Sequence, residues 1–280
     1  MNRRQFVSAA GVGAAALTGA VQAQQPVQRK GRIKQSVCRW CYNKIPTEDL
    51  CREAARLGIQ AIDLLNPKEW PIAKKYGLVP TVVPGPTTIT DGFNRKENHD
   101  AIEKKMREIL DHAAKEKIPS VIVFSGNRRG MSDEEGLENC VIGLNRIKKM
   151  AEDKGILVVM ELLNSKVDHP DYMCDRTAWG VEVVKRVNSP YVKLLYDIYH
   201  MQIMEGDVIR TIRENAQYIG HYHTGGNPGR NEIDDTQELN YKAITKAIIE
   251  LGFQGYMAHE FVPKRDPLKS LAEAVELCDV

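Results

Sequence analysis

The chain has 280 residues, and Lys+Arg 39 against Asp+Glu 37 leave a formal net charge of only +2. No basic patch stands out and aromatic residues make up only 6% of the chain, so we do not expect a nucleic-acid partner. Behind an apolar run near the N-terminus, about 250 residues remain without a second hydrophobic segment, which suits one large α/β domain.

The first residues have the order of an export signal. Arg3 and Arg4 precede an Ala- and Gly-rich apolar run at residues 7–21, and small residues follow at which cleavage is expected. The run is shorter than the roughly 20 residues that span a bilayer, which argues against a retained membrane anchor. The arginine pair resembles the twin-arginine type of signal. We expect residues 1–23 to be a cleaved twin-arginine signal and residues 24–280 to be the mature domain. The protein would then be periplasmic or otherwise exported, without stable membrane insertion after cleavage.

Short β-branched runs alternate with segments of helical periodicity along the rest of the chain. Strands are predicted at residues 33–38, 60–65, 78–83, 119–124, 156–160, 192–196, 218–223 and 255–259. Helices are predicted at residues 47–57, 67–76, 97–117, 132–154, 175–187, 206–215, 240–251 and 267–278. Eight strand–helix units in a chain of this length predict a closed (β/α)₈ TIM barrel. An open doubly wound sheet would need a glycine-rich phosphate loop after the first strand, where the sequence has Val37-Cys38-Arg39-Trp40.

The loop at residues 84–94 is long enough to act as a lid.

The six cysteines include one CxxC motif, Cys38-Arg39-Trp40-Cys41. A second CxxC and paired histidines at zinc-finger spacing are absent from the sequence, so a structural zinc site is not predicted. In an oxidising compartment Cys38 and Cys41 could close a strained disulfide. The simpler interpretation, which we favour, is two semi-buried thiols at a strand end.

Acids and a histidine stand at the ends of the last four predicted strands. They are Glu161, Asp197, His223 and Glu260, and in a barrel they would face one mouth. Taken singly, each has an ordinary explanation; Asp197, for example, could simply cap the next turn. Together, three carboxylates would repel one another unless a cation joined them. Oxygen-rich ligands with one nitrogen suit Mn²⁺ or Mg²⁺, and Zn²⁺ or Co²⁺ also accept them. His221 shares a strand face with His223, but His223 lies closer to the loop and is the expected ligand.

Residues 156–263 resemble the hydroxypyruvate isomerase family, within the xylose-isomerase-like TIM barrel superfamily of sugar phosphate isomerases and epimerases. The matching segments are ELLN at 161–164, DIYHMQIMEG at 197–206, IGHYH at 219–223, PGR at 228–230 and EFVP at 260–263. The resemblance implies a metal held by Glu161, Asp197, His223 and Glu260, with Glu161 and Glu260 as the acid/base pair. It also implies that His200 and Arg230 bind the substrate.

Two positions depart from this pattern. Hydroxypyruvate isomerases carry glutamine at the position of His223, and the histidine resembles the related ketose 3-epimerases instead. Those epimerases carry a further glutamate at the position of Val167. With these two departures, the matching segments still favour a metal-dependent isomerase that acts through an enediolate. Its substrate would be hydroxypyruvate, interconverted with tartronate semialdehyde, or a similar small α-hydroxy carbonyl compound or keto-sugar.

Other functions remain open at the level of the sequence. A ketose 3-epimerase, and a lyase or dehydratase acting on an oxidised sugar or inositol, would use the same barrel. An endonuclease for damaged DNA would need more histidines and a basic face, and a non-catalytic sugar-binding protein would tolerate the loss of both glutamates. The expected partner is a small-molecule substrate, and homo-oligomer formation is also left open.

Overall fold

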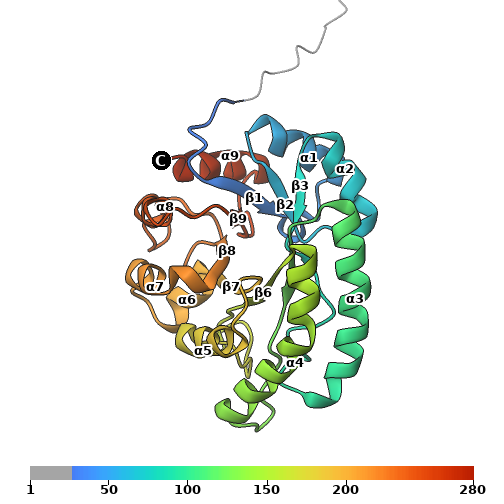
Figure 1. Ribbon diagram of the computed structural model, residues 1–280. Helices are drawn as coiled ribbons and strands as arrows, with labels where there is room; N and C mark the ends of the chain where they lie inside the picture. The colour runs from blue at the N-terminus through green and yellow to red at the C-terminus, as the bar shows by residue number, and fades with distance from the viewer. Residues whose placement is uncertain (1–26) are drawn as a thin grey trace, which may run out of the picture.

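The computed structural model describes residues 27–280 (Figure 1). The predicted export signal lies outside these residues and stays a prediction. Within the described part of the chain, every helix is too short or too polar to cross a membrane.

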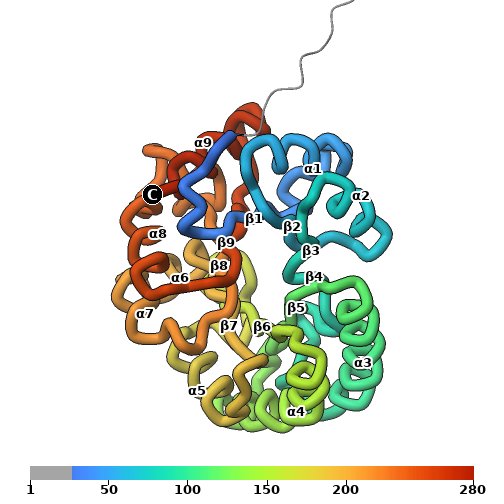
Figure 2. Tube along the Cα trace, turned by 45° about the horizontal axis from the view of Figure 1, so that its top comes forward, coloured from blue at the N-terminus to red at the C-terminus, as the bar shows by residue number. Residues whose placement is uncertain are grey.

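Parallel strands form the centre of the molecule, and helices surround them (Figure 2). The strands are β1 (Lys34–Cys38), β2 (Ala61–Asp63), β3 (Val79–Thr81), β4 (Val83–Pro84), β5 (Ser120–Val123), β6 (Leu157–Glu161), β7 (Val192–Asp197), β8 (Ile219–Thr224) and β9 (Tyr256–His259). Their order in the sheet is β3-β2-β1-β9-β8-β7-β6-β5-β4. The prediction of an α/β TIM barrel is confirmed as a TIM-barrel-like fold, nearly closed and built from nine strands in the described residues.

The ring is completed through a strand that is divided in two. The predicted strand at residues 78–83 forms β3, which pairs with β2, and β4, which pairs with β5. Val82 separates them with a φ of 45°, a conformation that β-branched residues rarely adopt. Its amide donates to the Ser120 hydroxyl (3.0 Å) instead of to a neighbouring strand. The barrel therefore has eight strand positions, one of which changes its pairing partner halfway along.

The helices run back along the outside of the barrel and cover its apolar outer face. They are α1 (Thr47–Arg56), α2 (Trp70–Lys75), α3 (His99–Glu116), α4 (Asp133–Lys154), α5 (Thr177–Val187), α6 (Ile198–Met204), α7 (Val208–Asn215), α8 (Tyr241–Glu250) and α9 (Pro267–Cys278). Short 3₁₀ helices cover Arg39–Tyr42, Pro67–Glu69, Lys96–Asn98 and Ala216–Tyr218. All eight predicted helices are present, α9 with its predicted bounds and the others with one or both ends shifted, and α6 is an additional helix.

The inside of the barrel has an apolar part and an ionisable part. Val82, Ile122, Val159 and Leu195 form a small buried cluster of their own, apart from the main core between barrel and helices. Side chains two residues apart on a strand share a face, so Leu195 and Asp197 point to the same side of β7. The apolar cluster therefore lies one layer below the carboxyl ends of the strands, where the candidate site is found.

Candidate active site

Four donor side chains come together at the mouth of the barrel. Glu161 ends β6, Asp197 ends β7, His223 lies near the end of β8, and Glu260 directly follows β9. All four are buried, and one donor atom from each lies within 4.8 Å of the others. The structure thus brings together the four residues that the sequence suggested as metal ligands.

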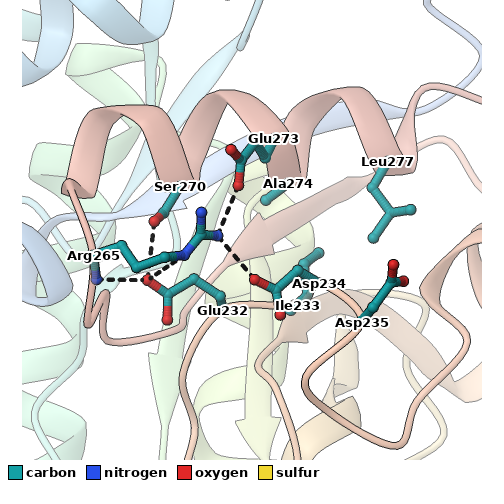
Figure 3. Close-up of a pocket in the computed structure, with 9 residues that line it drawn as sticks. All are labelled: Glu232, Ile233, Asp234, Asp235, Arg265, Ser270, Glu273, Ala274 and Leu277. Carbon is teal, nitrogen blue, oxygen red and sulfur yellow. Dashed lines mark hydrogen bonds and ion pairs between the residues drawn. The ribbon is translucent and has the colours of Figure 1, made fainter.

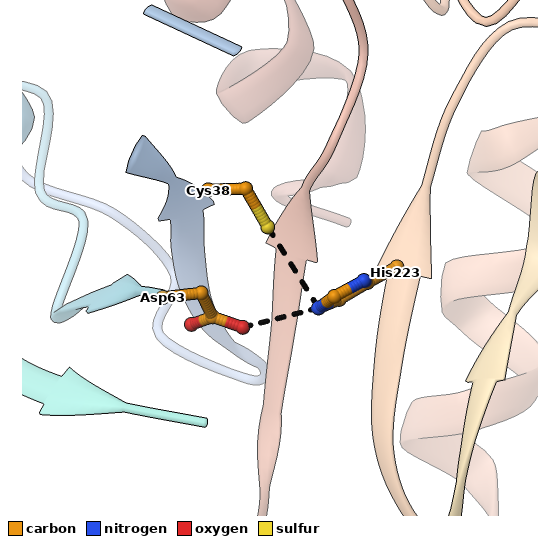
Figure 4. Close-up of side chains that lie close together, drawn as sticks. All are labelled: Cys38, Asp63 and His223. Carbon is orange, nitrogen blue, oxygen red and sulfur yellow. Dashed lines mark hydrogen bonds and ion pairs between the residues drawn. The ribbon is translucent and has the colours of Figure 1, made fainter. Parts of the chain in front are cut away.

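His223 is held through both nitrogens of its ring. Nδ1 lies 2.8 Å from Glu260 Oε2 and 3.3 Å from Glu161 Oε1. Nε2 faces the opposite way, 3.2 Å from Asp63 Oδ2 and 3.7 Å from Cys38 Sγ (Figure 4). Burial alone would lower the pKa of His223, but Cys38, Glu260 and the hydrogen bond to Asp63 raise it well above its ordinary value. The residue therefore connects the three carboxylates at the mouth to a second buried group deeper in the barrel.

That second group centres on Asp63, the last residue of β2. Its Oδ2 also lies 2.6 Å from His221 Nε2, and its Oδ1 accepts a hydrogen bond from the Ser36 hydroxyl. Burial would raise the pKa of Asp63, but His221 and His223 lower it. Burial raises the pKa of the Cys38 thiol well above its usual range, so Cys38 is a neutral thiol. Cys38, Asp63 and His223 also have donor atoms within 4.8 Å of one another.

Asp197 and His200 are linked through the start of α6. Asp197 Oδ1 accepts the backbone N–H of His200 at 3.1 Å, so this acid caps the helix as well as facing the site. His200 is fully buried, and its Nδ1 lies 2.6 Å from the Asn164 amide nitrogen, which donates to it. The proton of the ring therefore sits on Nε2, which has no hydrogen-bond partner among the described residues. Burial, together with Arg230, lowers the pKa of His200 well below its ordinary value and keeps the ring neutral.

Arg230 lies in the loop after β8 and reaches across the site. Its guanidinium stacks near the rings of Trp40 and Tyr199, at 5.3 and 5.5 Å from their centroids. Nη2 is 3.2 Å from Asp197 Oδ2 and also donates to Glu260 Oε2. The structure therefore places Arg230 on two carboxylates of the cluster, beside the position expected for a substrate.

The three carboxylates have different pKa values because their surroundings differ. Burial raises the pKa of Asp197 to about 7, although Arg230 opposes this. Burial and the nearby Glu260 also raise the pKa of Glu161. Burial would do the same to Glu260, but Arg230 and His223 hold its pKa well below the usual range. Arg230 and His223 therefore stabilise the ionised form of Glu260 much more than the ionised forms of Asp197 and Glu161.

The donor set fits a divalent cation. Glu161 Oε1 is buried and makes no hydrogen bond among the described residues, although His223 Nδ1 lies 3.3 Å away, and a buried carboxylate oxygen without a hydrogen bond is costly. Three carboxylates and one imidazole offer hard oxygen ligands and a single nitrogen, which suit Mn²⁺ or Mg²⁺. A cation at this position would satisfy Glu161 and offset the excess negative charge.

A cavity of about 400 Å³ opens over these residues. Glu161, Glu260 and Arg230 line one end, and the cavity extends from there over the ends of β2, β4 and β5. A second cavity, of about 260 Å³, lies between the β8–α8 loop and α9 (Figure 3). There Arg265 is already paired with Glu232, Asp234 and Glu273. The first cavity is the candidate active site, because Glu161, Glu260 and Arg230 line it.

Three contacts of this site were missed in the sequence. Trp40 Nε1 donates to Glu260 Oε1 at 2.6 Å, Asp63 supports His223, and Asn164 orients His200. Asp63 ends β2 in the structure but lies inside the strand predicted at residues 60–65, so the strand-end rule that found Asp197 passed over it. Trp40 lies inside the CxxC motif, where only the cysteines drew attention. Cys38 is buried and Cys41 partly buried, and both are free thiols.

Comparisons with known proteins agree with this architecture. A family model described as a xylose isomerase-like TIM barrel matches residues 51–279. The hydroxypyruvate isomerase of Escherichia coli is 32% identical over 135 residues, which cover 48% of this chain and 52% of that protein. A 2-oxo-tetronate isomerase of Pectobacterium atrosepticum is 27% identical over 238 residues, which cover 80% of this chain and 89% of that protein.

The extent of these similarities limits what they show. The chain spans about half the length of most of the curated relatives it matches. Among solved structures, an AP endonuclease of family 2 from Brucella melitensis superposes with a TM-score of 0.77 at 24% identity, covering 86% of this chain and 98% of that one. At that identity the likeness shows the fold alone.

Proposed function

The chain belongs to the xylose isomerase-like TIM barrel family, and from that premise we propose that it is a metal-dependent isomerase of α-hydroxy carbonyl compounds. The substrate would be hydroxypyruvate, converted to tartronate semialdehyde, or a keto-sugar. The observation that carries the proposal is the buried convergence of Glu161, Asp197, His223 and Glu260 at one end of an open cavity. The names of the relatives, hydroxypyruvate isomerase and 2-oxo-tetronate isomerase, support the same reaction class.

We propose that the four converging residues hold one divalent cation. Mn²⁺ or Mg²⁺ matches the oxygen-rich set best, and Zn²⁺ and Co²⁺ also accept it. When bound, the cation would supply Lewis-acid stabilisation of negative charge on the carbonyl oxygen of the substrate.

Glu161 and Glu260 are the proposed acid/base pair. They come from β6 and β9, with β7 and β8 between them, and can reach a planar enediolate from two sides. One glutamate removes the proton from the carbon next to the carbonyl, and the other returns a proton to the neighbouring carbon. Trp40 and Arg230 fix Glu260 through hydrogen bonds to its two oxygens. The net result is a proton moved from one carbon to the next and a hydroxyl proton moved to the former carbonyl oxygen, without an external oxidant or reductant.

His200 and Arg230 are the proposed substrate-binding residues. The N–H of His200 Nε2 is buried and unpaired among the described residues, so it can donate to a substrate hydroxyl. Arg230 lines the cavity over the carboxylates and offers a planar set of donors.

An epimerase is the second candidate. If the proton returned to the same carbon from the opposite face, the product would be an epimer. His223 favours this candidate, because it occupies the position where the hydroxypyruvate isomerases resembled by this sequence carry glutamine. A lyase would give a product lighter by one water, so product analysis distinguishes all three.

The test is to load the protein with Mn²⁺ and incubate it in D₂O with hydroxypyruvate and C4–C6 ketoses. We expect solvent deuterium on the carbon next to the carbonyl. Glu161→Gln and Glu260→Gln should each reduce turnover by roughly 10²–10⁴, the usual contribution of general acid–base catalysis. Glu273→Gln, which changes an exposed glutamate on α9 outside the site, serves as the control and should retain activity. Near-normal turnover by metal-loaded Glu260→Gln would refute the two-glutamate mechanism.

A further inference from the structure

The cavity over the candidate active site has two chemically different ends. Glu161, Glu260 and Arg230 line one end, as described above. Most of the side chains along the other end are apolar: Leu64, Pro84, Ile89, Ile122, Phe124 and Leu163. Thr87 also lines the cavity, and its hydroxyl already accepts the backbone N–H of Phe124 at 2.8 Å. This apolar end, which we call the apolar subsite, lies beyond the carboxylates, over the ends of β2, β4 and β5.

The lining of the cavity offers no unpaired cation to a second charged group on the substrate. Among the described residues that line it, only Arg230 is permanently cationic, and its guanidinium is bound to Asp197 and Glu260. Burial and the nearby Arg230 lower the pKa of His169, so this ring is neutral at neutral pH. A carboxylate or phosphate placed in the apolar subsite would lose its hydration without gaining a partner, which is costly.

The size of the cavity points the same way. A volume of about 400 Å³ lies within the range of roughly 300–1,000 Å³ found for pockets that hold drug-sized ligands. A three-carbon keto acid bound to the carboxylate end would leave most of this space to water. That water would rest against apolar walls, which is unfavourable and would be relieved by an apolar ligand group.

Several of these apolar side chains belong to cavity surface rather than to closed core. Leu64, Ile89 and Phe124 are only partly buried, whereas Ile122 and Leu163 are 3% and 2% exposed. Ile89 lies in the loop between β4 and α3, outside the strands of the barrel. Its side chain packs against the main core and also lines the cavity, where it offers apolar surface to a ligand.

We propose that the substrate is an uncharged α-hydroxy ketone with an apolar substituent about the size of an aromatic ring, namely a keto-glycoside with an aryl aglycone. This inference rests on the proposed function for the reacting end of the molecule and selects the keto-sugar over the keto acid. The hydroxy-ketone lies at Glu161 and Glu260, and the aglycone lies against Ile89 and Phe124. No charge of the substrate then enters the apolar subsite.

The first test measures binding alone, by calorimetry on the Mn²⁺-loaded protein. Phenyl β-D-glucoside should bind about tenfold more tightly than methyl β-D-glucoside, because the phenyl ring is buried in the apolar subsite. Ile89→Lys should remove this preference. The matched control is Leu251→Lys, which adds the same charge at a 40% exposed position just after α8, at the opposite end of the barrel. Equal binding of the two glucosides by the wild-type protein would overturn the proposal.

The second test measures turnover and separates this proposal from the proposed function. Phenyl 3-keto-glucoside should be converted with a kcat/KM at least about tenfold above that of hydroxypyruvate. Conversion of hydroxypyruvate in preference to the glucoside would refute the aryl substrate and leave the isomerase standing. Preferential binding of phenyl glucoside without turnover of any keto compound would support the apolar subsite and refute the proposed isomerase.

Discussion

At the scale of single residues, His223 depends on an acid from the far side of the barrel. Asp63 Oδ2 lies within hydrogen-bonding distance of Nε2 on both His221 and His223. If both rings donate to this carboxylate, their protons sit on Nε2, and His223 Nδ1 is left free to bind a cation. Carboxylates behind metal-binding histidines commonly fix the tautomer in this way. Asp63 is therefore a positioning residue for the proposed metal site.

We predict that Asp63→Asn weakens Mn²⁺ binding by about 10- to 100-fold. Asparagine can still present one oxygen to both histidines, with its amide nitrogen donating to the Ser36 hydroxyl, but it removes the negative charge that favours a proton on each Nε2. Competition with a chelator measures the affinity without reference to activity, and Co²⁺ absorption reports the coordination.

Ser36→Ala is the matched control, because it removes another hydrogen bond to Asp63 without changing a histidine tautomer. It should bind Mn²⁺ nearly as the wild type does. Unchanged affinity in Asp63→Asn would contradict the role of Asp63. Loss of a second equivalent of metal would instead show that Cys38, Asp63 and His223 bind a metal themselves.

Only those residues of the candidate site that lie at the carboxyl ends of strands could be predicted from the sequence. Glu161, Asp197 and Glu260 come directly after or at the end of apolar runs, and the barrel brings such positions together. The contacts of Trp40 and Asp63 depend on distance across the barrel and on side-chain direction. Neither property has a local signature in the sequence.

At the scale of elements, the strand–helix alternation was sufficient for the fold, and two details were not predictable. The first is the break between β3 and β4, where Val82 adopts a positive φ because its backbone N–H donates a hydrogen bond to the Ser120 hydroxyl. Sequence propensity argues against that conformation, so only the tertiary partner explains it. The second is α6, whose start is capped by Asp197. The sequence suggested such a cap only as an alternative to a role in the site, and no helix was predicted directly after it.

The loop that carries Arg230 is fastened to α9 by a second buried acid. Glu232 Oε1 accepts hydrogen bonds from the Arg265 amide and the Ser270 hydroxyl, each at 2.9 Å (Figure 3). The Lys264 amide donates to the same oxygen, also at 2.9 Å. Burial would raise the pKa of Glu232, but these donors lower it below its ordinary value of 4.5. The ionised carboxylate thus joins the loop after β8, which carries Arg230, to the start of α9 and the residues just before it.

We predict that Glu232→Gln lowers the free energy of unfolding by about 1–2 kcal/mol at neutral pH, since hydrogen bonds to a charged acceptor are replaced by weaker ones. Because the folded pKa lies below the unfolded one, the contribution of Glu232 is present above about pH 4.5 and is lost as the pH falls through the folded pKa. The difference between wild type and variant should therefore shrink in acid. Urea unfolding at pH 7 and at decreasing pH measures it.

Glu273→Gln provides the control for this prediction. Glu273 pairs with the same Arg265 at 2.7 Å, but its side chain is 42% exposed. Exposed ion pairs contribute little, so this variant should lose less than about 0.5 kcal/mol. Equal losses in both variants would show that Arg265, rather than the hydrogen-bonded carboxylate, stabilises the loop.

At the scale of the whole molecule, the two halves of the chain divide the work of the barrel. The C-terminal half supplies Glu161, Asp197, His223 and Glu260, and the N-terminal half supplies most of the apolar subsite. The chain as a whole is nearly neutral at +2, so the negative charge of the site is a local feature. This negative charge is concentrated in buried side chains that come together on folding. Repulsion among them therefore lowers the stability of the folded chain.

This repulsion links the proposed metal to the stability of the entire domain. A cation that binds the folded chain but not the unfolded one stabilises it by roughly 2.7 kcal/mol at a hundredfold excess over its Kd. For a domain of this size, that corresponds to a rise in Tm of roughly 5–10 °C. We predict such a rise when Mn²⁺ is added to chelator-treated protein, followed by calorimetry or circular dichroism.

Asp197→Asn should abolish most of this rise in Tm. Asparagine retains an oxygen that can accept the His200 amide and cap α6, but it removes one charged ligand from the cluster. Asp235→Asn removes the same charge from an exposed position and should respond to Mn²⁺ as the wild type does. The metal-free Asp197→Asn protein should also be at least as stable as the metal-free wild type at pH 8, because burial raises the pKa of Asp197 to about 7 and ionisation above that pH is unfavourable. An equal rise in Tm for wild type and Asp197→Asn would place the cation elsewhere in the molecule.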